Sequence, residues 1–421
     1  MKVKIAPFQA RGEVGAQTSK SFAHRLLICA ALADNESFVH MENRNEDIDA
    51  TLRCLSAFTR VEVFADGARV IPAKRENRTP LPELDCGESG STLRFLLPMA
   101  SALGGAFFTG RGRLPQRPLE DLMQAMRLSG AGFTSRSLPF AVDGGYAGGE
   151  SALPGNVSSQ YLTALLLAGP AVPKDTVIRL TTPLESAAYV DMTVQAMAAF
   201  GVEVERADGT YRVPGGRRYH APKEATAEGD FSSAAFPLCM GALAGPVTVR
   251  GLSQDSLQGD RAVTEILQAI GAVVSWQDDA VTVQRGDLRA LDVDVSAIPD
   301  MTPALAAVLM HAQGQSRLYN ASRLRLKESD RLVTVRDMVL SLGGRARIDG
   351  DALVIDGVAN AGGGQVDGAG DHRIVMAAAV ASSACMHESV LWGAEALNKS
   401  YPAFPRHFQI LGGKFDVVDD R

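Results

Sequence analysis

Alternating apolar and polar positions in three stretches of the chain predict pairs of short strands joined by tight turns. The stretches are AAFGVEVERADGTYRV from Ala198, AIGAVVSWQDDAVTV from Ala269 and LGGRARIDGDALVI from Leu342. In each, a helical run closes at glycine, and Val or Ile residues then alternate on both sides of an Asp-Gly or Asp-Asp pair. That pattern is typical of a β-hairpin. We therefore expect a helix followed by a hairpin as a recurring element.

A second pattern, a polar cap followed by a helix rich in Ala and Leu, recurs with the same period. Both features repeat at intervals of about 70 residues. A period of this length predicts a βαβ-type block rather than one turn of a solenoid, and six such blocks account for the chain. The cap positions are Ser19, Ser89, Ser158, Ser232, Thr302 and His372, and the residues that close the other helices are Thr59, Gly130, Gly201, Gly271, Gly343 and Gly412.

The six blocks divide into three plus three, which predicts an α/β protein of two domains. A length of 421 residues suits two domains of about 200 residues each. The Gly-rich and charged stretch Gly215–Gly229 is the best candidate for a linker. If each half closes on itself, the N-terminal strand (Met1–Phe8) lies beside the C-terminal half. We therefore expect one domain from residues 1–15 and 229–421, and another from 16–228, with the active site between them.

Composition restricts the kind of partner. The net charge of −6 argues against a general nucleic-acid surface, so any positive site must be local. Five scattered cysteines without a C-x-x-C pair argue against disulfides and against a metal site, and indicate the cytosol. The polar start does not resemble a signal peptide, and no apolar run reaches the length of about 18 residues that a membrane span requires.

Charged residues gather at the starts of the Ala- and Leu-rich helices. Lys20 and Arg25 follow the cap at Ser19, and His372 and Arg373 open another helix. A cation in the first turn opposes the helix dipole, which costs a few tenths of a kcal/mol unless an anion is bound there. Helix starts with added cations suit phosphate and carboxylate ligands. The cap serines taken singly are explained as ordinary helix caps.

Three further segments carry possible chemistry. Gly87–Thr92 (GESGST) fits a tight turn with a cap as well as it fits a phosphate cradle. Lys327–Arg331 combines cations and a carboxylate, and fits a solvated helix start equally. Asp300 is expected to cap its helix, and as a lone carboxylate in an apolar stretch it is also a candidate base. No nucleotide-binding glycine motif occurs in the proper setting, so no ATP or dinucleotide cofactor is expected.

Several segments in a fixed order resemble the 5-enolpyruvylshikimate-3-phosphate (EPSP) synthase family. They are SKSFAHR, CGESGSTLRF, QRPLEDL, NVSSQYLTALL, IPDMTPA, LRLKESDR, GDHRIVMA and NKSYPAF, and together they run from Ser19 to about Phe404. The resemblance implies a two-domain inverted α/β barrel-like fold, with three βαβαββ repeats in each domain. It implies transfer of the enolpyruvyl group of phosphoenolpyruvate to the 5-hydroxyl of shikimate 3-phosphate, in the shikimate pathway, and it implies that the inhibitor glyphosate binds in the same place as phosphoenolpyruvate.

The resemblance also implies roles for the matching positions. The residues implied in proton transfer are Asp300 and Glu328, with help from Lys20. Those implied for shikimate 3-phosphate are Lys20, Ser21, Arg25, Ser158, Ser159, Ser186, Tyr189, Asp300 and Lys327. Those implied for phosphoenolpyruvate are Lys20, Gly90, Arg117, Gln160, Arg331, Arg373 and Lys399. No contact is assigned to Glu88 or Arg323, where Asn is frequent in the family.

Two alternatives differ in chemistry or class. The sister family that transfers enolpyruvyl to UDP-N-acetylglucosamine uses a loop cysteine shortly before an Arg-Pro pair, and here Gly110–Pro118 contains no cysteine. A ring-shaped clamp on nucleic acid would need cations along its inner helices, whereas these helices are apolar beyond the first turn. We expect a monomer that binds small anionic substrates, without nucleic acid, membrane, metal or cofactor.

Overall fold

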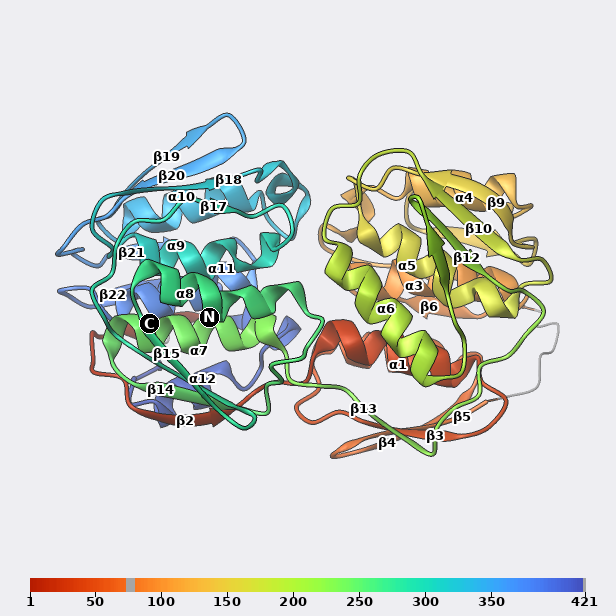
Figure 1. The fold of residues 1–421 in the computed structure, drawn as a ribbon, viewed down its shortest axis with the longest axis horizontal. Coiled ribbons are helices and arrows are strands. Elements are labelled where there is room, and N and C mark those ends of the chain that lie inside the picture. Colours follow the sequence, from red (N-terminus) through yellow and green to blue (C-terminus); the bar gives the residue numbers. More distant parts are fainter. Residues whose placement is uncertain (73–79, 419–421) are drawn as a thin grey trace. The chain divides into compact units, whose positions relative to one another are not determined.

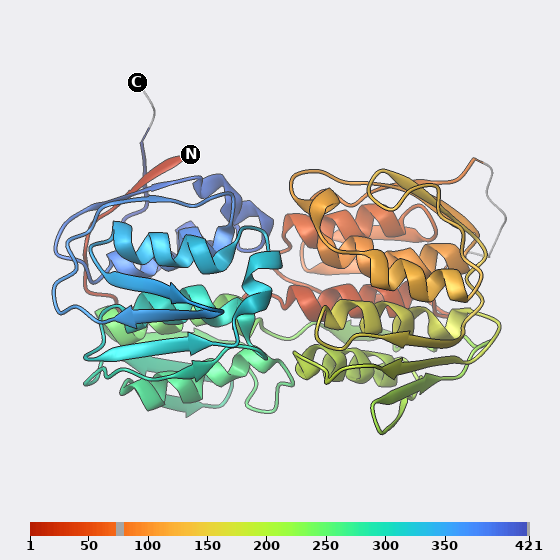
Figure 2. The same cartoon turned by 90° about the horizontal axis from the view of Figure 1, so that it is seen from above.

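The computed structural model describes residues 1–72 and 80–418, which form two compact units. Unit 1 consists of Met1–Gln17 together with the chain from Glu228 onward, and unit 2 is Thr18–Ala227. Figure 1 shows the elements of each unit, and Figure 2 shows that successive repeats occupy separate sectors of their unit.

Unit 2 contains three sheets among its described residues, in the orders β13-β3-β5-β4, β6-β7-β8 and β11-β12-β10-β9. Its strands are β3 (Ser37–His40), β4 (Arg60–Phe64), β5 (Gly67–Ile71), β6 (Glu83–Asp85), β7 (Gly105–Thr109), β8 (Phe140–Asp143), β9 (Gly149–Leu153), β10 (Thr176–Leu180), β11 (Glu205–Ala207), β12 (Thr210–Val213) and β13 (Glu224–Thr226). Its helices are α1 (Lys20–Ala31), α2 (Glu46–Leu55), α3 (Gly90–Ala102), α4 (Glu120–Leu128), α5 (Ser159–Ala168) and α6 (Ala187–Ala199), with the 3-10 turns η1 (Leu114–Gln116) and η2 (Gly169–Ala171).

Unit 1 repeats this plan with the sheet orders β15-β16-β14-β2, β17-β18-β20-β19 and β21-β22-β1-β23. Its strands are β1 (Lys2–Ile5), β2 (Gly12–Gly15), β14 (Val247–Arg250), β15 (Val273–Gln277), β16 (Ala280–Gln284), β17 (Val293–Asp294), β18 (Gln315–Tyr319), β19 (Arg345–Asp349), β20 (Ala352–Asp356), β21 (Gln365–Asp367), β22 (Ser389–Trp392) and β23 (Asp416–Val418). Its helices are α7 (Phe231–Ala244), α8 (Val263–Ile270), α9 (Thr302–Leu309), α10 (Arg331–Ser341), α11 (His372–Ser382) and α12 (Phe404–Ile410), with the 3-10 turns η3 (Gly259–Ala262), η4 (Pro299–Met301), η5 (Ser322–Leu326) and η6 (Ala394–Lys399).

All six sheets share one pattern of pairing. Each has a parallel pair followed by antiparallel neighbours, as in β9 with β10 and then β12 and β11. In the three-stranded sheet, an isolated antiparallel bridge from Phe133 to Val142 stands in the place of the fourth strand. The predicted hairpins at Asp208-Gly209, Asp278-Asp279 and Gly350 are confirmed. The predicted α/β class and its repeats are therefore present at the level of strand pairing.

In the first repeat of each unit, the strand of the parallel pair at the sheet edge comes from a segment that is distant in the sequence. β13 pairs in parallel with β3, and β2 pairs in parallel with β14. β1, at the N-terminus, lies between β22 and β23 and so completes the last sheet of unit 1. The chain passes between the units at two places, and a paired strand, β2 or β13, directly precedes each of them. The stretch 215–229, the linker candidate, contains the boundary between the units at residues 227 and 228, and it also contains β13 and the fully buried Tyr219.

The first helix of each repeat lies inside its unit, and the sheets lie outside (Figure 1). These helices are apolar on nearly every face, and a helix of that kind is stable only where all its sides are covered. In α7 every residue from Phe231 to Ala244 is buried. In unit 1 the helices α7, α9 and α11 pack on one another, and in unit 2 the same is true of α1, α3 and α5. The second helices, such as the amphipathic α2 and α8, bury only one side.

Candidate functional site

The serines predicted as helix caps in unit 2 have that role. The hydroxyl of Ser19 accepts from the backbone N–H of Phe22, that of Ser89 from Thr92, and that of Ser158 from Gln160. Side chains at these starts also reach one another, because the Gln160 amide donates to Ser91 Oγ at 3.0 Å. The N-termini of α3 and α5 are thus neighbours, and their unpaired N–H groups contribute positive potential to one region.

Lys20, the first residue of α1, is paired with Asp47. Its Nζ lies 2.9 Å from the carboxylate, and both side chains are largely buried. Asp47 sits in the first turn of α2, where the helix dipole favours an anion. The cost of a cation at the start of α1 is therefore offset by the protein itself. Asp47 was missed in the sequence, because an acidic residue in a first turn is ordinary.

Arg25 braces three helices of unit 2. Its Nε donates to Thr193 Oγ1 at 2.8 Å, Nη2 donates to the carbonyl of Tyr189 at 2.8 Å, and Nη1 donates to the carbonyl of Ser21. Burial lowers the pKa of Arg25 to about 10, so it remains a cation at neutral pH. These bonds fix Ser21 and Tyr189, two of the predicted site residues, relative to each other. Another predicted site residue, Ser186, is the N-cap of α6 and has a left-handed backbone conformation with φ of 55°.

Arg117 lies directly against Gly90 at the start of α3. A Cβ atom added to Gly90 would be 2.7 Å from Nη1 of Arg117 and 3.0 Å from its Cζ. Only glycine leaves room for the guanidinium at this helix N-terminus. The loop that carries Arg117 is held to the preceding turn, since Arg111 N donates to the Gly87 carbonyl at 2.8 Å and Glu88 packs on Gly112. Glu88 thus has a contact within the loop.

Arg94 connects Gln160 with the loop of Arg117 and was missed in the sequence. Its Nη1 donates to Gln160 Oε1 at 2.5 Å and its Nη2 donates to the Pro118 carbonyl at 3.0 Å. The Tyr161 hydroxyl donates to the same carbonyl at 2.6 Å. A buried arginine in the apolar run TLRFLL was a usable signal, because such a cation needs partners. We call Lys20, Ser21, Arg25, Gly90, Arg117, Ser158, Ser159, Gln160, Ser186 and Tyr189, which all belong to unit 2, the Lys20 cluster.

Asp300 in unit 1 faces three cations and does not cap a helix as expected. It lies in η4, and the residue that precedes α9 is Met301, which has no capping side chain. The Asp300 carboxylate is 3.1 Å from Lys327 Nζ, 2.6 Å from Arg331 Nη1 and 3.7 Å from Arg373 Nη2. Burial opposes ionisation, but Lys327, Arg373 and Arg331 together hold the pKa of Asp300 well below its usual range. Asp300 is therefore an anion at neutral pH.

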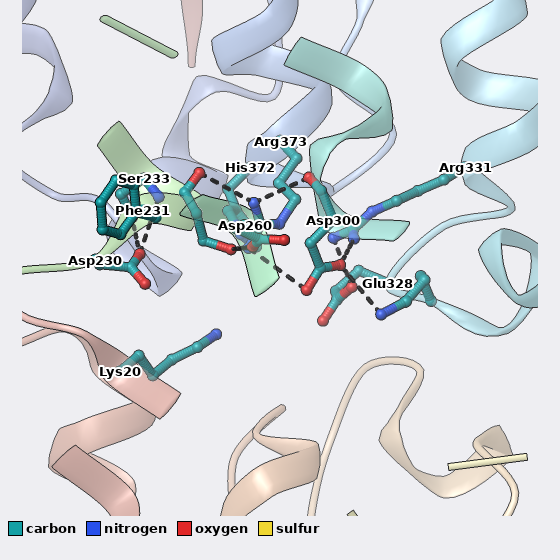
Figure 3. A network of polar contacts seen from close by, with 12 residues as sticks. Lys20, Asp230, Phe231, Ser233, Asp260, Asp300, Glu328, Arg331, His372 and Arg373 are labelled. Atoms are coloured by element: carbon teal, nitrogen blue, oxygen red, sulfur yellow. Dashed lines mark hydrogen bonds and ion pairs between the residues drawn. The ribbon is translucent and has the colours of Figure 1, made fainter. Parts of the chain in front are cut away.

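Arg331 is the buried centre of this group. Only 1% of its side chain is exposed, and it bonds to Asp300, to Glu328 at 2.7 Å and to Asp371 at 2.7 Å. Figure 3 shows Asp300 and Glu328 at the end of the Arg331 side chain. Asp371 is the N-cap of α11, and its negative charge opposes the unfavourable charge of Arg373 in the first turn of that helix. The expectation that only bound anions compensate the helix-start cations is therefore wrong in part, because carboxylates of the chain already do so.

Arg373 reaches the starts of two other helices. Its Nη1 donates to the carbonyl of Asp300 at 3.2 Å, and its Nη2 donates to the Ser232 hydroxyl at 3.0 Å. Lys399 ends η6, which packs on α11, and its side chain is nearly buried. We call Asp300, Lys327, Glu328, Arg331, Asp371, Arg373 and Lys399, which all belong to unit 1, the Asp300 cluster. Each cluster collects helix N-termini, cations and polar groups that suit small anions.

Two findings concern the described part of the chain as a whole. No group of three or more His, Cys, Asp or Glu residues there is arranged to hold a metal ion. None of the described helices is long and apolar enough to cross a membrane. The five cysteines are free and buried.

Comparisons with known proteins agree on one family. Residues 6–408 match the family model described as EPSP synthase (3-phosphoshikimate 1-carboxyvinyltransferase). Proteins named 3-phosphoshikimate 1-carboxyvinyltransferase are 37% identical in Clostridium kluyveri, covering 98% of both chains, and 38% identical in Methanocorpusculum labreanum, covering 98% of this chain and 99% of that one. The structure of an EPSP synthase from Acinetobacter baumannii superposes with a TM-score of 0.85 at 24% identity, over 99% of this chain and 100% of that chain. This last likeness supports the fold.

Replacing Arg331 by glutamine is expected to destabilise unit 1 by about 3–5 kcal/mol at pH 7, because three carboxylates lose a buried partner. The pKa values of Asp300 and Asp371 are depressed in the folded protein. Their contribution is present above the unfolded pKa of about 4 and is lost as the pH falls. The difference in unfolding free energy between the wild type and the variant should therefore shrink toward pH 4, because the carboxylates that lost their partner take up protons. Urea unfolding at pH 7 and at pH 4 measures this difference.

Arg325→Gln is the matched control. Arg325 pairs with Asp330 at 3.1 Å, but both side chains are exposed, so the loss should stay below about 1 kcal/mol. An Arg331→Gln variant as stable as this control would show that Arg331 is not the centre of the cluster.

Proposed function

The chain belongs to the EPSP synthase family, and from this premise we propose how its two clusters carry out the reaction of that family. The reaction transfers the enolpyruvyl group of phosphoenolpyruvate to the 5-hydroxyl of shikimate 3-phosphate and releases phosphate, as a step toward the aromatic amino acids. The observation that carries this conclusion is the family match across residues 6–408, together with the named relatives at 37–38% identity.

We assign the substrates to the predicted residues of both clusters. The residues proposed for shikimate 3-phosphate are Lys20, Ser21, Arg25, Ser158, Ser159, Ser186, Tyr189, Asp300 and Lys327. Those proposed for phosphoenolpyruvate are Lys20, Gly90, Arg117, Gln160, Arg331, Arg373 and Lys399. The support is chemical: cations and helix N-termini suit a pair of substrates that carry about five to six negative charges. Arg25 contributes its charge and holds Ser21 and Tyr189 in place.

The chemistry needs one proton acceptor and one group that serves the methylene carbon. The 5-hydroxyl oxygen bonds to the central carbon of phosphoenolpyruvate while Asp300 takes the hydroxyl proton. Glu328, helped by Lys20, delivers a proton to the methylene carbon, which gives a tetrahedral ketal. The C–O bond to phosphate then breaks as the methyl group returns a proton to Glu328, which restores a double bond. Proton transfers of this kind contribute about 10²–10⁴-fold each.

The depressed pKa of Asp300 makes it a weak base until anions arrive. Lys327, Arg331 and Arg373 lower that pKa because their charges face the carboxylate. A bound phosphate or carboxylate competes for the same three cations. Since each added negative charge disfavours the ionised form of its neighbours, the pKa of Asp300 rises on binding. Substrate binding thus brings Asp300 closer to the range in which a general base is effective.

We further propose that the enzyme works without a cofactor, as a monomer in the cytoplasm. The buried free thiols of its five cysteines are in keeping with a reducing compartment.

A phosphate-release assay tests the function. With phosphoenolpyruvate, the wild-type protein should release phosphate when shikimate 3-phosphate is added and not when UDP-N-acetylglucosamine is added. A reaction that contains phosphoenolpyruvate but neither acceptor serves as the blank. Release with UDP-N-acetylglucosamine alone would favour the sister family, whose loop cysteine has no counterpart in Gly110–Pro118.

The two proposed proton carriers are tested by Asp300→Asn and Glu328→Gln. Each variant keeps the shape of the side chain but removes the carboxylate, so kcat should fall by about 10²-fold or more. Steady-state kinetics measures this, and circular dichroism checks the fold. Asp337→Asn is the control, because Asp337 is exposed and pairs with its neighbour Arg336. A variant that turned over like this control would remove its residue from the mechanism.

Gly90→Ala tests the placement of Arg117. The added methyl group would meet the far end of the flexible Arg117 side chain, so the fold should tolerate it while the guanidinium moves. The KM for phosphoenolpyruvate should rise about tenfold or more, which is the effect expected of one misplaced methyl group in a binding pocket. The KM for shikimate 3-phosphate should change little. Inhibition by glyphosate should weaken in parallel. Gly362→Ala, where a Cβ meets nothing within 4 Å, is the control.

If Gly90→Ala and Gly362→Ala had the same KM for phosphoenolpyruvate, Gly90 and Arg117 would not belong to its pocket.

A further inference from the structure

A second buried carboxylate, Asp260, lies beside Arg373 in unit 1 (Figure 3). It belongs to η3 and is 4% exposed. Its Oδ2 accepts a hydrogen bond from the Ser232 hydroxyl, while Oδ1 has no hydrogen-bond partner among the described residues. Burying a carboxylate with one oxygen unsatisfied is costly. Neither the sequence patterns nor the proposed assignments gave Asp260 a role that accounts for this cost.

The direction of the hydrogen bonds around Ser232 is fixed by the chemistry of its neighbours. Arg373 Nη2 is 3.0 Å from Ser232 Oγ, and a guanidinium can only donate. The hydroxyl oxygen must therefore accept from Arg373 and send its single proton to Asp260. Removing Asp260 frees this hydroxyl to rotate, and the lone pair that Arg373 uses then loses its orientation.

Arg373 is held on two more sides by backbone. Its Nη1 donates to the carbonyl of Asp300 at 3.2 Å and to that of Ser232 at 3.4 Å. These carbonyls belong to the starts of α9 and α7, which are rigid and buried. The Asp300 carboxylate, 3.7 Å from Nη2, adds an ion pair. Among the hydrogen bonds described, the one to the Ser232 hydroxyl can change direction by rotation, and Asp260 is the residue that sets it.

The loop that carries Asp260 is anchored to the same helix start. Gln258 Oε1 accepts from Phe231 N at 3.0 Å, and Gln258 Nε2 donates to the Gly229 carbonyl at 2.7 Å. Asp230 caps α7 by accepting from Ser233 N at 2.9 Å. Asp260 is therefore held at a fixed position relative to Ser232.

Several charged groups act on Asp260. The pKa of Asp260 is raised to about 6 by the sum of these effects: burial, the largest cause, and the charges of Asp300 and Asp230 raise it, while Arg373 and the Ser232 hydrogen bond lower it. Above that pH the carboxylate is ionised, and a hydrogen bond to an ionised acceptor is stronger and better oriented than one to a neutral acceptor. At pH 7.5 the chain from Arg373 through Ser232 to Asp260 is charged at both ends.

We propose that Asp260 is a positioning residue that acts through the Ser232 hydroxyl to orient the Arg373 guanidinium for binding phosphoenolpyruvate. This inference rests on the proposed function, in which Arg373 binds that substrate. Asp260 does not touch either substrate and takes no part in proton transfer. Its effect is on the affinity for one of the two substrates.

Steady-state kinetics at pH 7.5 tests the proposal with four variants. Asp260→Ala removes the acceptor and should raise the KM for phosphoenolpyruvate about tenfold, with kcat and the KM for shikimate 3-phosphate within about twofold. Asp260→Asn keeps an acceptor oxygen and should restore most of the affinity. Ser232→Ala should match Asp260→Ala. The exposed neighbour Asp255 provides the control, as Asp255→Ala.

The double variant Asp260→Ala with Ser232→Ala decides whether the two residues act in series. If Asp260 acts through Ser232, the second substitution adds little to the first, whereas independent effects would multiply. The proposal is overturned if the KM for phosphoenolpyruvate stays unchanged in Asp260→Ala, if Asn does no better than Ala, or if the single effects multiply. A fall in kcat with a rise of both KM values would show a merely structural role. A wild-type protein without turnover would refute the proposed function, and this inference with it.

Discussion

Three apolar helices packed side by side in each unit are the constraint on which the rest of the structure depends. Because each is hydrophobic on nearly every face, it must be covered on all sides, and the sheets and second helices provide the cover. The N-termini of these helices meet at one end of their unit, as the contacts of Gln160 with Ser91 and of Arg373 with Ser232 show. The unpaired N–H groups and the positive ends of the helix dipoles are therefore close together at the starts of these helices.

Charge at these helix starts is balanced in the protein before any ligand enters. Asp47 forms an ion pair with Lys20, and Asp371 forms one with Arg331. Such pairs lower the cost of holding cations next to a positive dipole. In the proposed function, an anionic substrate takes the place of carboxylates of the chain at these cations. Because the same cations face Asp300, we propose that binding is coupled to its basicity.

Residues that bind and residues that hold them in place differ in how visible they are in the sequence. Lys20 and Arg373 stand out because a cation in the first turn of a helix opposes the helix dipole, whereas Arg117 was indicated only by the family resemblance. Arg94 contacts Gln160, and Asp260 contacts Ser232. Arg94 is visible as a cation in the apolar run TLRFLL, whereas the run that contains Asp260 has an ordinary pattern. The capping role expected for Asp300 was wrong because the chain enters α9 through the 3-10 turn η4, which turns its carboxylate toward three cations.

The sequence by itself determined the α/β class, the six-fold repeat and the hairpins, because these depend on local periodicity and turn residues that each block carries within about 70 positions. It also determined which motifs resemble the family. Only the tertiary structure decided that β13 and β2 complete the first sheet of each unit, and which carboxylate faces which cation. Such pairings join residues distant in the chain, and their geometry follows from packing, which no local pattern encodes.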